Sequence, residues 1–250
     1  SIKNPKLYWD NNVKGTETLL KVMQMFDCSL IIFSSTASLY GSVNSKRIRE
    51  DFKIRPNNQY SKTKAKIEEI LFNLHSDFPN KWRIANLRYF NPIGAHPSGK
   101  LGENPKGSID NIFPIINRVA GKLQNKLQIY GKDWGTKDGT CIRDYIHVLD
   151  LAEGHIAALK YLFKNKSQII VFNLGTGSGT SVLELVKTFE RCNNIKISST
   201  FVERREGDIE SCVADISKAK EILKWEPSRD LIQMCQDGWK WQLKNMKKSF

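Results

Sequence analysis

A tyrosine and a lysine stand four positions apart in this sequence, at Tyr60 and Lys64. On a helix this spacing places both side chains on one face, about one turn apart. A free tyrosine has a pKa of about 10, so accepting a proton near neutral pH requires a drop of roughly three units, or about 4 kcal/mol. A cation about 4 Å away at an effective dielectric constant of about 20 supplies a similar amount before screening. The pair therefore predicts a tyrosine base that a lysine activates.

The neighbouring segments decide whether this pair does chemistry, because an isolated Tyr-x-x-x-Lys is usually a solvated pair on a helix. Residues 30–33 form a short apolar run typical of a buried parallel strand, and three hydroxyl residues follow at 34–36. Residues 82–90 form a second strand-like run. Ligands of open α/β sheets bind beyond the carboxyl ends of the strands. We therefore expect both runs and the Tyr60 helix to deliver polar groups to one end of one sheet.

Two helices are expected beside these strands. The first takes Asp10 as its N-cap, and the second begins near Tyr60 after a polar loop over residues 42–58. Their apolar stripes have the spacing of one helical face and consist of Val13, Leu19, Leu20 and Met23 in the first, and Ile67, Ile70, Leu71 and Leu74 in the second. Helices and buried strands in alternation predict an α/β fold.

The composition is that of a soluble globular protein: 250 residues, of which 40% are hydrophobic and 26% charged. No apolar run is long enough to span a bilayer, and the first residues show no signal-peptide pattern, so no membrane association is expected. The cysteines are odd in number, scattered and without a Cys-x-x-Cys spacing, namely Cys28, Cys141, Cys192, Cys212 and Cys235. This usage suits free thiols in a reducing compartment, and we expect a cytoplasmic protein.

The net charge is high, at +13 from 39 Lys plus Arg and 26 Asp plus Glu. A nucleic-acid-binding protein would cluster its basic residues with aromatic ones or carry a recognisable module. Here they are spread out, apart from a run at 240–248 where the cations suit a helix C-terminus. Nucleic acid is therefore not an expected partner, whereas a positive field favours a substrate that carries a diphosphate.

Four longer strings accompany the Tyr-Lys pair, at residues 34–41, 88–99, 138–148 and 204–208. Together they resemble the UDP-glucose 4-epimerases, a family of the extended short-chain dehydrogenase/reductases. The similarity runs from the first residues almost to the last. Within it Thr36, Tyr60 and Lys64 match the hydroxyl, tyrosine and lysine of the superfamily.

The resemblance implies a Rossmann-like, doubly wound parallel sheet with a smaller α/β substrate domain. Residues 1–91 would be the C-terminal part of the NAD-binding domain, and residues 92–250 mainly the UDP-sugar-binding domain, with some elements packing back on the sheet. The chain begins with Ser1, and no strand-Gly-x-Gly-x-x-Gly-helix unit precedes the first helix. By resemblance, the missing part would hold the first strands and most of the NAD contacts.

The resemblance also implies the residues of the site. Tyr60, Lys64 and Thr36 would be catalytic, with NAD as the cofactor and no metal. The cofactor-binding residues would be Asn11, Ser34, Thr36, Tyr60, Lys64, Tyr89 and Phe90. The substrate-binding residues would be Thr36, Tyr60, Asn91, Asn111, Ile112, Gln128, Ile129, Tyr130, Arg143, Arg205, Asp208 and Cys212. Such proteins are homodimers, and we expect one here.

The implied reaction interconverts UDP-glucose and UDP-galactose in galactose metabolism. Tyr60 would remove the proton of the sugar's 4-hydroxyl, Thr36 would hold that hydroxyl, and Lys64 would stabilise the phenolate and bind the nicotinamide ribose, while NAD takes the hydride from C4 and returns it on the other face. Thr36 replaces the commoner serine and keeps its donor and acceptor. Cys212 is small beside the sugar's C2 group, so UDP-GlcNAc and UDP-GalNAc are also expected to fit.

Two alternatives stay open. The first is another extended short-chain nucleotide-sugar enzyme such as a dehydratase, although Ala37-Ser38 occupies the place of the acid/base pair that a dehydratase needs. The second is a non-catalytic fragment that lacks the NAD phosphate loop and acts as a binding or dimerising module.

Two further motifs are expected to be structural. Residues 175–179, Gly-Thr-Gly-Ser-Gly, follow a strand-like run, but their spacing differs from that of a dinucleotide loop. They predict a strand-to-helix turn, with Ser181 starting the helix. His147 lies in a strand-like stretch without a second metal ligand at a suitable spacing, which predicts a packed, hydrogen-bonded histidine.

Overall fold

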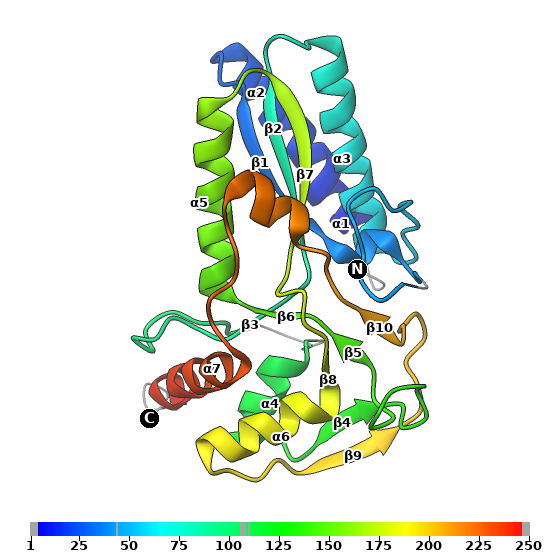
Figure 1. Ribbon diagram of the computed structural model, residues 1–250, viewed down its shortest axis with the longest axis vertical. Helices are drawn as coiled ribbons and strands as arrows, with labels where there is room; N and C mark the ends of the chain where they lie inside the picture. Colours follow the sequence, from blue (N-terminus) through cyan, green and yellow to red (C-terminus); the bar gives the residue numbers. More distant parts are fainter. Residues whose placement is uncertain (1–4, 44, 106–108, 110, 247–250) are drawn as a thin grey trace. The chain divides into compact units, whose positions relative to one another are not determined.

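The computed structural model describes residues 5–43, 45–105, 109 and 111–246. The chain divides into two compact units (Figure 1). Unit 1 consists of Ser1–Phe90, Glu153–Leu174 and Ala214–Glu226. Unit 2 consists of Asn91–Ala152, Gly175–Val213 and Pro227–Phe250.

Unit 1 is built around a parallel sheet with the strand order β1-β2-β7. Its strands are β1 (Leu30–Thr36), β2 (Arg83–Tyr89) and β7 (Gln168–Leu174). They lie in step along their whole length, because Leu30 pairs with Arg83 and Arg83 with Gln168, and the pairing continues to the last residue of each strand. The three carboxyl ends therefore meet in one row, as the sequence predicts, and the α/β class is confirmed.

Helices cover both faces of this sheet. They are α1 (Pro5–Trp9), α2 (Gly15–Met25), α3 (Gln59–Asp77) and most of α5 (Val148–Lys164), with the short π-helices η1 (Asp10–Lys14) and η3 (Ala219–Leu223) and the 3₁₀ turn η2 (Ala37–Tyr40). One buried cluster joins α2 and α3 to β1 and β2 through Leu20, Leu71 and Ile84. Figure 1 shows α5 on the other side of the sheet, where a Cβ added to Gly154 would lie 3.0 Å from Leu174 of β7.

The expected helix start at Asp10 is wrong. The helical backbone begins at Pro5 and runs through α1, η1 and α2, and Asp10 lies inside it. Proline suits the first turn of a helix because its missing N–H would be unpaired there. Asp10 instead forms an ion pair with Lys14, one turn later, at 2.6 Å.

The start of the Tyr60 helix follows from a local capping pattern. Asn58 is the N-cap of α3: its side chain accepts a hydrogen bond from the Ser61 N–H, and the Ser61 hydroxyl accepts one from the Asn58 N–H. This reciprocal pair is a capping box. The loop expected before it is confirmed, since the described part of residues 42–58 contains no helix or strand. Tyr60 therefore lies in the first turn of α3.

In its described residues, unit 2 has three small sheets and three helices packed around its own core. The pairs are β3 (Asn91–Ile93) with β6 (Tyr145–His147) and β4 (Leu127–Tyr130) with β9 (Ser199–Val202), and the third sheet has β5 (Ile142–Arg143) between β8 (Thr180–Ser181) and β10 (Ser211–Cys212). The helices are α4 (Ile112–Ala120), α6 (Val182–Asn193) and α7 (Leu231–Met246).

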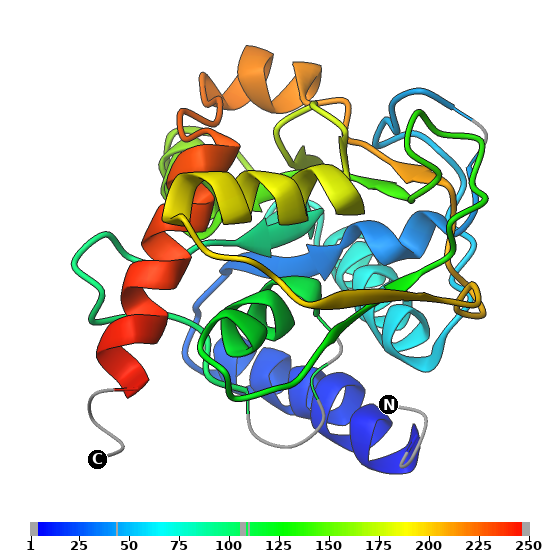
Figure 2. The same cartoon turned by 90° about the horizontal axis from the view of Figure 1, so that it is seen from below.

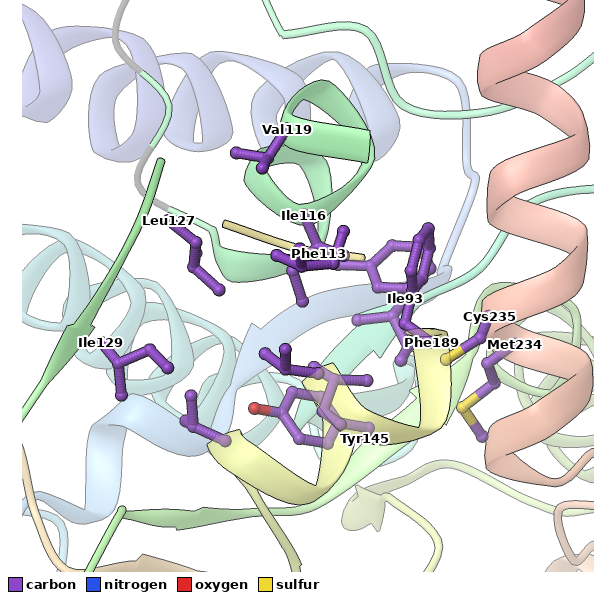
Figure 3. Close-up of a cluster of buried hydrophobic side chains, with 14 of the residues drawn as sticks. Ile93, Phe113, Ile116, Val119, Leu127, Ile129, Tyr145, Phe189, Met234 and Cys235 are labelled. Carbon is purple, nitrogen blue, oxygen red and sulfur yellow. The ribbon is translucent and has the colours of Figure 1, made fainter. Parts of the chain in front are cut away.

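The core of unit 2 gathers apolar side chains from all three helices (Figure 3). Phe113 of α4, Phe189 of α6 and Met234 of α7 are each at most 4% exposed. The rings of Phe113 and Phe189 meet edge to face, 6.1 Å apart, and Phe189 meets Trp239 in the same way. Accordingly α6 and α7 lie side by side (Figure 2). No helix in the described part of the chain is both long and apolar enough to cross a membrane.

Candidate functional site

Tyr60 and Lys64 lie beside the carboxyl end of β1. The Lys64 ammonium is 5.7 Å from the centroid of the Tyr60 ring, and its Nζ donates a hydrogen bond to the Ser34 carbonyl oxygen at 2.9 Å. Burial raises the pKa of Tyr60, and a hydrogen bond with Thr36 acts in the opposite direction. Burial lowers the pKa of Lys64. Tyr60, Lys64 and the β1 residues Ser34 and Thr36 thus meet at one place in unit 1.

Thr36 is held at the start of η2. Its backbone is extended, and its side-chain oxygen accepts a hydrogen bond from the Ser38 N–H at 3.2 Å, as an N-cap does. Thr36 is 8% exposed. A hydroxyl that is fixed by its own turn and acts on the pKa of Tyr60 has the chemistry to orient a substrate hydroxyl beside a base.

Tyr89 ends β2 next to Ser34, and its environment includes a residue that the sequence does not single out. The Tyr89 hydroxyl donates to Ser34 Oγ at 2.6 Å and contacts Nε2 of His155 on α5. The Tyr89 and His155 rings meet edge to face at 5.3 Å. Burial raises the pKa of Tyr89. His155 is 66 positions from Tyr89, so no local spacing could have identified it.

The remaining cofactor-binding residues predicted in unit 1 differ in exposure. Phe90 is buried and follows directly after β2. Asn11 is exposed within η1, whereas its neighbour Asn12 donates a hydrogen bond to Thr63 Oγ1 on α3 at 3.2 Å. A single π-helical turn at this position fits a functional region, where such turns are frequent.

In unit 2, two arginines converge on one carboxylate. Asp208 Oδ1 lies 3.0 Å from Nη2 of Arg205 and 3.5 Å from Nη2 of Arg143. Asp208 is largely buried, whereas half of the Arg205 side chain is exposed and lies over the ring of Tyr130 at 5.5 Å. Cys212 of β10 pairs with Arg143 of β5. Planar guanidinium groups suit bidentate binding of phosphate.

The other predicted substrate residues come from separate elements of unit 2. Along β4, Gln128 and Tyr130 are exposed and Ile129 is buried, as expected for a strand. The Tyr130 hydroxyl donates to Gln128 Oε1 at 3.1 Å. Asn111 and Ile112 begin α4, and the Asn91 N–H donates to the Asp144 carbonyl oxygen at 2.9 Å.

The glycine-rich turn at 175–179 is structural, as predicted. Asp144, a fully buried residue, accepts hydrogen bonds from the N–H of Thr176 at 2.7 Å and of Gly177 at 2.9 Å. These amides would have to face a phosphate in a dinucleotide loop, but an internal carboxylate already occupies them. Ser181 then caps α6 with a capping box through Glu184, so the predicted helix start is confirmed.

His147 is also packed and hydrogen-bonded, as predicted. It is fully buried in β6; its Nδ1 accepts from the Leu149 N–H, and its Nε2 lies 3.3 Å from Asp237 Oδ2. Burial lowers the pKa of His147, and the bond with Asp237 opposes this. Within the described ranges, no group of three or more His, Cys, Asp or Glu side chains is arranged to hold a metal ion.

Comparisons with known proteins agree with this geometry. The family model described as GDP-mannose 4,6 dehydratase matches residues 1–238. A UDP-glucose 4-epimerase of Bacillus subtilis is 47% identical over 98% of this chain and 72% of that protein, and UDP-glucose 4-epimerase 1 of Oryza sativa is 47% identical over 98% of this chain and 70% of that protein.

Solved structures give the same result. The UDP-glucose-4-epimerase of Stenotrophomonas maltophila with bound NAD and formylated UDP-arabinopyranose has a TM-score of 0.95 and 41% identity over 99% of this chain and 73% of that one. The Bifidobacterium longum enzyme in complex with NAD+ and UDP has a TM-score of 0.93 and 43% identity over 98% and 73%.

The parallel sheet, with a Tyr-Lys pair and hydroxyls at its carboxyl end, defines an extended short-chain dehydrogenase/reductase. At 47% identity over nearly the whole chain, the chain belongs to the UDP-glucose 4-epimerase family. The resemblance stated from the four sequence strings is confirmed.

Proposed function

We propose that the protein interconverts UDP-glucose and UDP-galactose by NAD-mediated oxidation and re-reduction at C4 of the sugar. The observation that carries this proposal is the meeting of Tyr60, Lys64 and Thr36 at the end of β1, in a chain 47% identical to named UDP-glucose 4-epimerases. The dehydratase and the non-catalytic fragment are not favoured, because the relatives at this identity are epimerases over 98% of the chain.

The residues of unit 1 fit a nicotinamide cofactor. The row of carboxyl ends presents the Ser34 and Tyr89 hydroxyls together with the Lys64 ammonium, which are donors suited to ribose and carboxamide oxygens. We assign NAD binding to these three groups and to Asn11, Thr36, Tyr60 and Phe90. NAD supplies a hydride acceptor and donor for C4.

Each catalytic residue has a distinct role. Tyr60 takes the proton of the 4-hydroxyl and returns it, and Thr36, whose hydroxyl acts to lower the pKa of Tyr60, holds the substrate hydroxyl in line. Burial raises the pKa of Tyr60, so the base needs a compensating charge. Lys64 provides it, because a cation 5.7 Å from the ring favours the phenolate.

Residues of unit 2 are proposed to bind the UDP part. Arg205 and Arg143 bind the diphosphate and Asp208 the ribose, and their mutual contacts place the three groups together. The other proposed substrate contacts are Asn91, Asn111, Ile112, Gln128, Ile129, Tyr130 and Cys212. Burial raises the pKa of Cys212 to about 11, so its thiol is neutral at physiological pH. A small neutral side chain here supports acceptance of N-acetylated sugars as well.

We further propose a homodimer in the cytosol. Apolar side chains are exposed together on α2 and just after it, at Leu19, Val22, Met25 and Phe26, with Phe72 exposed on α3. Exposed apolar side chains of this kind support a protein contact. All five cysteines are free, as expected in a reducing compartment.

The test replaces Tyr60 by phenylalanine in the protein at its full natural length. Epimerase activity should disappear, while UDP binding measured by calorimetry should stay within about twofold, because the residues assigned to UDP lie on other elements. Near-normal turnover of the Tyr60→Phe protein would remove Tyr60 from its role. A folded wild-type protein with bound NAD but no epimerase activity would refute the proposed function.

A further inference from the structure

A buried ion pair joins α3 to β2 near the proposed catalytic residues. Glu68 and Arg88 are 6% and 3% exposed. Arg88 donates from Nε to Glu68 Oε1 at 3.0 Å and from Nη2 to Glu68 Oε2 at 2.6 Å, so the guanidinium binds the carboxylate in a bidentate manner. Burial acts to lower the pKa of Arg88, but the bonds and charge of Glu68 outweigh it and raise that pKa. Such a pair adds little stability over an apolar replacement, so its value lies in geometry.

The partners of this pair are sequence neighbours of the proposed site. Glu68 is four positions after Lys64 and eight after Tyr60, on the same stripe of α3. Ser35, which lies between the two hydroxyls assigned to the site, donates from Oγ to Glu68 Oε1 at 2.5 Å. Arg88 directly precedes Tyr89. One carboxylate therefore fixes α3 against both β1 and β2.

The contacts continue across the sheet. Arg88 Nη1 donates to the Tyr40 hydroxyl at 2.9 Å, and that hydroxyl donates to Asn173 Oδ1 at 2.7 Å. Ser35, Arg88 and Asn173 are register partners in β1, β2 and β7. We call these three residues the polar row. Fully bonded buried networks of this kind fix one arrangement, because each broken bond leaves a buried polar group unpaired.

We propose that Glu68 and Arg88 are positioning residues of the epimerase reaction, which hold α3 so that Tyr60 and Lys64 stay in place beside β1. The inference rests on the proposed function, and it assigns no direct contact with substrate or NAD to either residue. Because the pair is neutral as a whole, it holds the helix without adding a net charge that would oppose the Tyr60 phenolate.

The test uses Glu68→Gln and Arg88→Lys in the protein at its full natural length. We expect kcat to fall about 10- to 100-fold with KM little changed, since small displacements of catalytic groups have effects of this size. Ultraviolet titration of tyrosinate, taken as the difference from the Tyr60→Phe protein, should show a raised pKa of Tyr60 in both variants. A pure charge effect would lower that pKa in Glu68→Gln, so the sign separates positioning from electrostatics.

Two further variants serve as a control and as a milder change in the same network. Glu69→Gln breaks an exposed ion pair with Lys66 on the same helix and should change neither readout. Ser35→Ala leaves the ion pair in place and should shift both readouts in the expected direction, by less. Variants of Glu68, Arg88 and Ser35 that lose stability but keep the wild-type kcat and Tyr60 titration would overturn the inference. If the unmodified protein is inactive, the proposed function fails instead, and the Tyr60 titration alone decides the inference.

Discussion

Replacement of Lys64 by methionine tests the charge that activates Tyr60. With the ammonium 5.7 Å from the Tyr60 ring centroid, Coulomb's law at an effective dielectric constant of about 20 gives about 3 kcal/mol in favour of the phenolate. Tyr60 is 37% exposed, so solvent screening reduces this by roughly half, to about 1.4 kcal/mol, or one pKa unit.

The sign of the effect follows from the charge. A cation favours the phenolate, so its removal raises the pKa of Tyr60 by about one unit. At a pH below that pKa, the phenolate fraction and kcat should fall about tenfold, and the loss should shrink as the pH is raised through the shifted value. Loss of the bond to the Ser34 carbonyl, 2.9 Å in the structure, adds a smaller reduction that persists at high pH.

The measurement is kcat between about pH 6 and about pH 10, from an assay that detects UDP-glucose formed from UDP-galactose. Lys62→Met is the matched control, because Lys62 is an exposed lysine on the same helix. Its profile should coincide with that of the wild type. If the rising limb of the Lys64→Met profile stays where it is in the wild type, the charge of Lys64 does not tune Tyr60, and the reasoning is refuted.

Three further changes probe unit 2. Cys212→Tyr should lower kcat/KM for UDP-GlcNAc at least about tenfold while affecting UDP-glucose much less; equal losses for the two substrates would contradict the assigned place of this residue. Asp144→Asn removes the charge that receives the Thr176 and Gly177 amides, and should cost about 1 to 3 kcal/mol of unfolding free energy; an unchanged denaturation midpoint would argue against it. Burial lowers the pKa of His147 in the folded protein, so the unfolded chain binds a proton more readily at this residue. The unfolding free energy of the wild type, measured with urea, should therefore decline below about pH 6.5. In His147→Gln this decline should be smaller.

Local signals in the sequence predict the elements that carry the site. The apolar run at 30–33 leads into the hydroxyls of β1, and the second run, 82–90, matches β2 within a residue at each end. The Tyr60 helix and the helix that Ser181 caps are set by capping groups a few positions away. Such short-range patterns are readable because the interacting groups are neighbours in the chain.

Long-range contacts are not readable in the same way. Glu68 is one of several charged residues on α3, and helical periodicity does not reveal that it faces Arg88, 20 positions later on a strand. The contact of Tyr89 with His155 spans 66 positions. The misplaced start of the first helix has a different cause: Asp10 has the chemistry of an N-cap, but Pro5 opens the helix earlier. In the two long-range contacts the outcome depends on packing that one sequence does not display.

The polar row also favours one register of the strands of unit 1 over its neighbours. Sliding β2 by two residues against β1 keeps the inward and outward alternation of side chains, so apolar matching alone penalises it little. Arg88 would then face Phe33 or a residue beyond the end of β1, and the buried carboxylate of Glu68 would lose its guanidinium, a change that is strongly unfavourable. The Glu68–Arg88 ion pair thus helps to select the register of β2 against β1. Weakening this ion pair should speed amide hydrogen exchange first in β1, before the apolar cluster beneath α3 opens.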